Sequence, residues 1–157
     1  MTSGEIRAVT PRAELPKVEA ILPHAGSSVL LSRVLEHRPT DTVCCVELRE
    51  PTLFSEPDGG VPAWVGVEYM AQCIAAHAGL LELSNGARPR AGYLIGSREI
   101  VLHTARFDPE QVLEVSARHV WGGREGMVSF DCSVIDATTR ELLVEARLNC
   151  FLPPEEK

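Results

Sequence analysis

The run "VPAWVGVEYMAQCIAAHAGLL", residues 61–81, constrains the fold most strongly because Glu68 is the only formally charged side chain in it. Pro62 suits the first turn of a helix, where its missing N–H costs nothing. The apolar character continues to about Leu83, and "SNGARPR" then ends it. These features predict one long helix. An unpaired carboxylate inside an apolar interior costs several kcal/mol, so Glu68 needs either a partner or a chemical task.

A membrane-spanning helix is the alternative interpretation of an apolar run of about 20 residues. Three polar side chains interrupt the run, namely Glu68, Gln72 and His77. Sequence typical of strands follows it, and polar groups are rare in lipid-facing helices. A buried core helix is therefore the prediction, and no contact with a membrane is expected.

Strand patterns lie on both sides of the predicted helix. Residues 42–50 are rich in β-branched and small apolar side chains, and residues 91–103 alternate less regularly around Gly92 and Gly96. Three later segments alternate with a period of two, so each has one apolar face. In the first of them, that face holds Leu113, Val115, Ala117, His119 and Trp121; the other two segments are 126–136 and 141–151.

These elements together predict an α+β chain. A single helix that is apolar almost all round is satisfied if a curved antiparallel β-sheet, apolar on one face, wraps around it. That arrangement is the hot-dog fold. We expect one hot-dog domain over residues 21–152 and an extended N-terminal lead-in over 1–20. The lead-in has no apolar signal region, so a cytoplasmic location is the default.

Composition excludes several classes of function. The net charge is −7 and the isoelectric point is near 5.2, and no basic stripe is present, which argues against nucleic-acid binding. Any acidic protein partner would need a local basic patch, and the nearest arginines are best interpreted as separate solvated side chains. The cysteines are odd in number and form no CxxC motif, so neither a disulfide framework nor a zinc site is predicted. The arginines are Arg88, Arg90, Arg98 and Arg106, and the cysteines are Cys44, Cys45, Cys73, Cys132 and Cys150.

Several motifs resemble the 3-hydroxyacyl-acyl-carrier-protein dehydratase family of hot-dog proteins, over essentially residues 20–152. They are "LPHAGSSVLLSRVLEH", "VELREPTLF", "VPAWVGVEYMAQCIAAHAGLL" and "ARF". Within that family, "GGVPAWVGVEYMAQ" is most similar to the predicted dehydratases of aryl-polyene pigment pathways. The resemblance implies dehydration of 3-hydroxyacyl thioesters on acyl carrier protein to trans-2-enoyl thioesters. It also implies no metal or organic cofactor, and a homodimer or a heteromer with another hot-dog subunit.

The resemblance also implies site residues. The family's catalytic carboxylate precedes a Met-Ala-Gln triplet, which Glu68 matches, and an apolar tunnel favours the protonated carboxyl that proton transfer requires. Gln72 shares the helix face of Glu68 one turn later. Backbone N–H groups at Pro62-Ala63 would polarise the thioester carbonyl. The expected substrate-binding residues are Pro62, Ala63, Trp64, Gln72, Tyr93 and Phe54.

The histidines depart from the family pattern. The loop before the helix, "TLFSEPDGGVPA", contains no histidine, and Phe54 stands opposite the family's catalytic histidine. His24 in "LPHAG" matches a second family histidine and is the replacement candidate, with a capping role in the N-terminal turn as its alternative. His77 cannot meet Glu68 on one helix, because nine residues at about 100° each place it on the opposite side.

Three alternatives remain open at this point. The stretch "DGGVPAWVGVE" is reminiscent of hot-dog thioesterases, with Asp58 where their histidine stands. Loss of the loop histidine also fits a non-catalytic subunit that binds acyl chains or completes a partner's active site. Finally, Glu68 has a purely structural interpretation as a buried carboxylate paired with an arginine, for instance from "GSREI".

Overall fold

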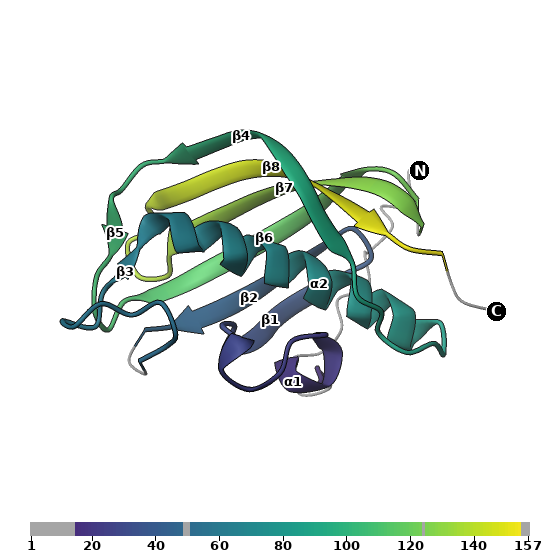
Figure 1. Cartoon of the computed structure of the whole chain (residues 1–157), viewed down its shortest axis with the longest axis horizontal. Coiled ribbons are helices and arrows are strands. Elements are labelled where there is room, and N and C mark those ends of the chain that lie inside the picture. The colour runs from purple at the N-terminus through teal and green to yellow at the C-terminus, as the bar shows by residue number, and fades with distance from the viewer. Residues whose placement is uncertain (1–14, 49–50, 124, 155–157) are drawn as a thin grey trace, which may run out of the picture.

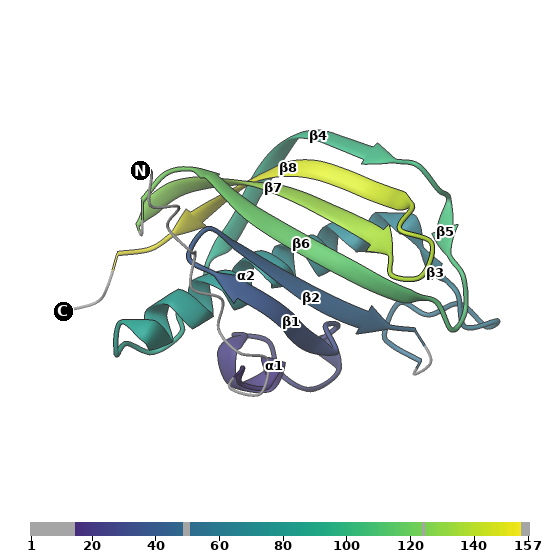
Figure 2. The same ribbon diagram turned by 180° about the vertical axis from the view of Figure 1, so that it is seen from behind.

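A curved sheet wrapped around one long helix is the main feature of the molecule (Figure 1). The computed structural model describes residues 15–48, 51–123 and 125–154. Six antiparallel strands form the sheet in the order β1-β2-β6-β7-β8-β4, and a separate two-stranded sheet pairs β3 with β5. The predicted hot-dog fold is therefore confirmed. Figure 2 shows the sheet from behind, with α2 on its far side.

The elements follow one another along the chain in a simple order. They are α1 (Val18–Ile21), η2 (Gly26–Ser28), β1 (Arg33–Arg38), β2 (Asp41–Glu47), β3 (Val61–Pro62), η3 (Ala63–Val65), α2 (Gly66–Ser84), β4 (Tyr93–Leu102), β5 (Arg106–Phe107), β6 (Val112–Trp121), β7 (Gly126–Asp136) and β8 (Leu142–Leu152). The five predicted strands correspond to β2, β4, β6, β7 and β8.

The start of the long helix differs from the prediction. Pro62 lies in β3, where it pairs with Arg106, and not in the first helical turn. A 3₁₀ turn begins at Ala63, and the α-helix itself begins at Gly66. The missing N–H of proline is tolerated here because β3 is a two-residue strand at an edge.

One side of α2 packs on the sheet and is fully buried, with Tyr69, Met70, Cys73 and Ala76 at 0% exposure. α1 packs against the helix near Gly79, where an added Cβ would lie 2.5 Å from the carbonyl oxygen of Ile21. Val18 and Ile21 belong to the same hydrophobic core. The predicted boundary at residue 20 therefore falls inside α1, while residues 1–14 of the lead-in lie outside the described residues.

The predicted alternation of buried and exposed side chains holds along most of β6, β7 and β8, and it fails at the end of β6. Leu113, Val115 and Ala117 are buried against the helix, but Trp121 is 63% exposed. The register of β6 against β7 shifts between His119 and Trp121. Because a bulge inserts one extra residue, it reverses the face of every later side chain, and the predicted inward position of Trp121 is therefore wrong.

β4 forms one edge of the main sheet, and no strand among the described residues pairs with its outer side. All ten of its residues are exposed, and its pairing with β8 shifts register at 94–96 and at 97–99, in the segment where Gly96 predicts bending. Six of its exposed side chains are apolar: Tyr93, Leu94, Ile95, Ile100, Val101 and Leu102. A long apolar edge strand of this kind is a pairing surface unless something covers it.

Candidate active site

A carboxylate and an imidazole meet beside the N-terminal half of α2. Glu68 lies in the first turn of the helix, and His24 lies on the segment between α1 and η2. The Nε2 atom of His24 is 3.6 Å from Oε1 of Glu68, and the two side chains are 29% and 42% exposed. The chain therefore brings its two predicted catalytic residues together from positions 44 residues apart in the sequence.

The surroundings of Glu68 differ from the expected apolar interior. Its side chain is nearly half-exposed because its side of the helix, shared with Ala71 and Ala75, faces an open cavity and not the sheet. Its partners are His24 and Gln72, not an arginine. Arg98, from "GSREI", lines a groove with the outward residues of the sheet. The interpretation of Glu68 as a buried structural ion pair is therefore wrong for the single chain.

Gln72 fixes the position of Glu68. It is fully buried, and its Nε2 donates to the backbone carbonyl of Ser28 at 2.7 Å and to Oε1 of Glu68 at 3.0 Å. Its Oε1 accepts a hydrogen bond from the N–H of Leu30 at 2.9 Å. Both N–H groups of the amide are thus used within the protein. Gln72 positions the carboxylate and anchors the segment after His24, so it is not available to bind substrate.

The pair opens into a cavity of about 260 Å³. Tyr93, at the start of β4, lines the same cavity as Glu68 and His24. The Nδ1 atom of His24 has no hydrogen-bond partner among the described residues, so the protein does not fix the tautomer of this ring. Apart from the polar end, the wall is mostly apolar: it includes Ala71, Ile74, Ala75, Ala78, Leu94 and Leu152. The site can therefore hold an apolar chain against an acid–base pair.

The other predicted substrate-binding residues lie outside the lining of this cavity. Phe54 and Trp64 contact each other edge to face, with ring centroids 5.8 Å apart, and Trp64 is 58% exposed. The N–H of Ala63 already donates to the carbonyl of Ala105 at 3.1 Å, so it is not the free donor that was expected. Pro62 is engaged in β3. None of these four residues lines the cavity that contains Glu68.

Asp58 is held by Arg106. The guanidinium donates to both carboxylate oxygens, at 2.8 and 2.6 Å, and the N–H of Gly60 donates to Oδ1 at 3.0 Å. The Gly60 N–H and then Arg106 lower the pKa of Asp58. An added Cβ at Gly60 would lie 1.7 Å from the guanidinium, so a larger residue there would displace the end of the Arg106 side chain. A carboxylate bound in this way is a poor general base.

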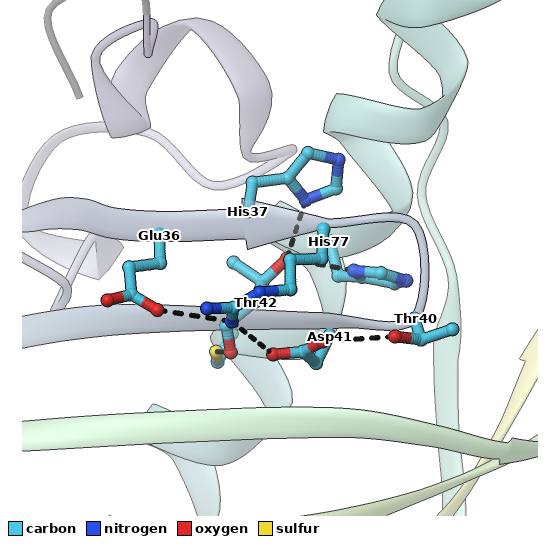
Figure 3. A network of polar contacts seen from close by, with 8 residues as sticks. Glu36, His37, Thr40, Asp41, Thr42 and His77 are labelled. Carbon is cyan, nitrogen blue, oxygen red and sulfur yellow. Dashed lines mark hydrogen bonds and ion pairs between the residues drawn. The ribbon is translucent and has the colours of Figure 1, made fainter. Parts of the chain in front are cut away.

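A histidine network at the other side of α2 was missed by the sequence analysis (Figure 3). The hydroxyl of Thr42 lies 2.8 Å from Nδ1 of His37 and 2.8 Å from Nδ1 of His77. The hydroxyl has one proton, so it can donate to at most one of the two rings, and the tautomer of each ring sets which group donates. The β1–β2 hairpin register, which pairs His37 with Thr42, is the signal that could have revealed it.

This network predicts a loss of stability in mild acid. Burial, then His37 and His119, lower the pKa of His77 from 6.5 to about 4. The unfolded chain therefore takes up the proton first, and the free energy of unfolding falls by roughly 3 kcal/mol as the pH drops from about 6.5 to about 4. Urea titrations over this range should show the slope in the wild type and its reduction in His77→Gln. Equal slopes in the two proteins would refute the assignment.

The arginines and the metal-ligating side chains give little support for further sites. Arg106 is neutralised by Asp58, and Arg90 bonds to Glu82 at 3.3 Å and to the carbonyl of Pro153 at 2.8 Å. Within residues 15–48, 51–123 and 125–154, no group of three or more His, Cys, Asp or Glu side chains is placed to hold a metal ion. No helix in that part of the chain is long and apolar enough to cross a membrane.

A curved antiparallel sheet around one long helix, with a carboxylate and an imidazole on the wall of one cavity, places the chain in the class of hot-dog proteins. Comparison with protein-family models makes the assignment specific, because residues 16–157 match the ApeP-like family, described as ApeP dehydratase. The chain therefore belongs to the ApeP-like dehydratase family. The search of curated proteins gave no significant match.

Solved structures support the fold. The dehydratase heterocomplex ApeI:P from Xenorhabdus doucetiae aligns with a TM-score of 0.81 and 26% identity, covering 89% of this chain and 93% of that one. Zebra fish thioesterase superfamily member 2 aligns at 0.62 with 14% identity, over 86% and 92% of the two chains. A hypothetical thioesterase from Streptococcus pneumoniae, solved with coenzyme A, aligns at 0.58 with 17% identity, over 80% and 88%. The two thioesterases show the fold alone.

Proposed function

We propose that this chain dehydrates 3-hydroxyacyl thioesters carried on acyl carrier protein, in a pathway that builds a polyene or fatty acyl chain. The observation that carries the proposal is the 3.6 Å approach of His24 Nε2 to Glu68 Oε1 on the wall of an apolar cavity. Membership of the ApeP-like dehydratase family supports dehydration as the reaction type.

The two groups suit the two proton transfers of the reaction. Dehydration removes a proton from the carbon next to the thioester carbonyl and adds one to the hydroxyl on the adjacent carbon. In the proposed cycle, His24 takes the carbon-bound proton and the carboxyl group of Glu68 gives a proton to the departing water. The cycle closes when His24 returns the proton to Glu68, across the short distance that separates them. No external acid, base or oxidant is required.

The proposal is tested by incubating the purified chain with 3-hydroxyacyl thioesters on acyl carrier protein. Intact-mass spectrometry of the carrier should show the loss of one water from the acyl group. Release of free hydroxy acid, with regeneration of the unloaded carrier, would identify a thioesterase instead. The Asp58–Arg106 pair argues against that outcome, because Asp58 is the group that would replace the thioesterase histidine.

A half-site subunit is the second candidate function. The loop before α2 contains no histidine, and one solved relative, ApeI:P from Xenorhabdus doucetiae, is a dehydratase heterocomplex. In this alternative, Glu68 would act together with a histidine from a second hot-dog subunit. The two candidates differ in one measurable respect, which is whether the purified chain is active alone.

We expect β4 to pair with a second subunit, either another copy or a different hot-dog chain. β4 carries six exposed apolar side chains, and two of them, Tyr93 and Leu94, also line the cavity that holds Glu68. Sedimentation velocity at micromolar concentration should show a dimer. Ile95→Lys should shift it to monomer, whereas Leu83→Lys, an exposed apolar residue at the end of α2, should not. A monomeric wild-type chain that also fails to bind a hot-dog partner would refute the expectation.

A further inference from the structure

A second cavity continues the first along α2. Its volume is about 230 Å³, and it shares two lining residues, Ala78 and Leu152, with the cavity that contains Glu68. Arg90 lines the first cavity, and Glu82 lines the second. The ion pair between them joins the walls of the two cavities. The two cavities are therefore neighbours, separated by a small side chain on the helix and one leucine on β8.

The helix side that connects them is built from small side chains. Ala71, Ala75 and Ala78 follow Glu68 at intervals that keep all four within about one quarter of the helix circumference. Each alanine also lines the first cavity. A flexible chain entering at Glu68 can therefore lie along these alanines, with Ile74 as the bulky residue of α2 beside its path.

The second cavity is lined by two histidines and by the carboxylate of Glu82, which pairs with Arg90. His77 is 1% exposed, and its Nδ1 is occupied by Thr42, while its Nε2 makes no hydrogen bond among the described residues. His119 also lines this cavity, and its ring packs edge to face on Phe130 with centroids 5.5 Å apart. Burial lowers the pKa of His77 to about 4, so this ring is neutral near neutral pH. The free Nε2 either donates or accepts, according to the tautomer of the ring, and a hydroxyl group can pair with it in both cases. A carboxylate can only accept, and in this cavity it would lie near the carboxylate of Glu82.

We propose that the second cavity receives the distal end of the acyl chain and that His77 and His119 select chains whose end carries a hydroxyl group. This inference rests on the proposed function, because it assumes that an acyl thioester reacts at Glu68. It adds a specificity site that lies beyond the acid–base pair.

The geometry sets the chain length. Glu68 and Ala78 are ten residues apart on one helix, which corresponds to about 15 Å along its axis. An extended carbon chain advances about 1.3 Å for each bond of about 1.5 Å, so about twelve carbons cover this distance. A hexanoyl chain therefore ends in the first cavity, and a hexadecanoyl chain reaches the second.

The test uses binding and not turnover. The ligands are pantetheine analogues in which an amide replaces the thioester, so they neither dehydrate nor hydrolyse readily. Their acyl chains are hexanoyl, hexadecanoyl, ω-hydroxyhexadecanoyl and ω-carboxyhexadecanoyl. Calorimetric titration of the wild type should give about fivefold tighter binding of the ω-hydroxy chain than of the methyl-ended chain, as one added neutral hydrogen bond implies. The ω-carboxy chain should bind more weakly than the ω-hydroxy chain. His119→Phe should remove the preference for the hydroxyl.

Substitutions on the helix test the path. Ala78→Phe should weaken the hexadecanoyl ligands at least tenfold and leave the hexanoyl ligand unchanged, whereas Ala75→Phe, one turn nearer Glu68, should weaken both. Leu152→Phe narrows the same junction from β8 and replaces Ala78→Phe if that variant fails to fold. Equal affinities of the two chain ends in the wild type, or equal weakening of short and long ligands by Ala78→Phe, would overturn the inference.

Failure of the proposed function would look different. It would appear as a lack of water loss from the hydroxyacyl carrier while the pattern of analogue binding persisted. An active dehydratase that did not distinguish the chain ends would overturn only the specificity site.

Discussion

Replacing Glu68 with glutamine is expected to abolish turnover while leaving the fold intact. The amide keeps the shape of the side chain but cannot carry the proton, and a positioned acid or base contributes a factor of about 10² to 10⁴. The side chain is 42% exposed, so its charge contributes little to folding, and the free energy of unfolding should change by no more than about 0.5 kcal/mol. Both quantities are measured on the same preparation, by carrier mass spectrometry and by urea denaturation.

Glu36→Gln provides a matched control. Glu36 is a half-exposed carboxylate on β1 that contacts Arg38, away from the cavity. This variant should retain full activity. Should Glu68→Gln stay active but unfold at clearly lower urea concentration, Glu68 would be a structural residue that holds Gln72 and the segment after His24 in place.

The fold could be predicted from sequence because its signals are local. The period of two in residues 126–136 and 141–151 and the apolar run from residue 61 each follow from the side chains alone. The two-stranded sheet of β3 and β5 was missed, since strands of two residues carry no period. The outward position of Trp121 was also missed, because a bulge is a property of two strands and not of one.

The site was only partly predictable, because it is formed by packing between distant segments. The helix position of Glu68 and its neighbour Gln72 followed from spacing, but the three hydrogen bonds that bury Gln72 depend on where residues 28–30 lie. The exposure of Glu68 depends on the space between α2 and β4. Phe54 and Trp64 were expected near the carboxylate only because of the family resemblance. That resemblance gives no information on where their side chains lie, and in the structure they contact each other.

Substitution of His24 by alanine is the other change expected to have a large effect. His24 is the imidazole nearest to Glu68, and it faces the same cavity. If it supplies the base, its removal should lower turnover by about 10² to 10⁴ without affecting assembly. His103→Ala is the matched control, since His103 contacts Glu145 at an exposed position away from the cavity.

The outcome of His24→Ala decides between a self-sufficient site and a shared one, because the wild-type chain is assayed both alone and with a hot-dog partner. Activity of the chain alone that disappears in His24→Ala, with unchanged denaturation, identifies His24 as the base. Activity that requires the partner and survives His24→Ala places the base on the other subunit and makes Glu68 one half of a shared site. Activity of the chain alone that survives His24→Ala contradicts both arrangements, because the 3.6 Å contact between His24 and Glu68 would then have no catalytic role.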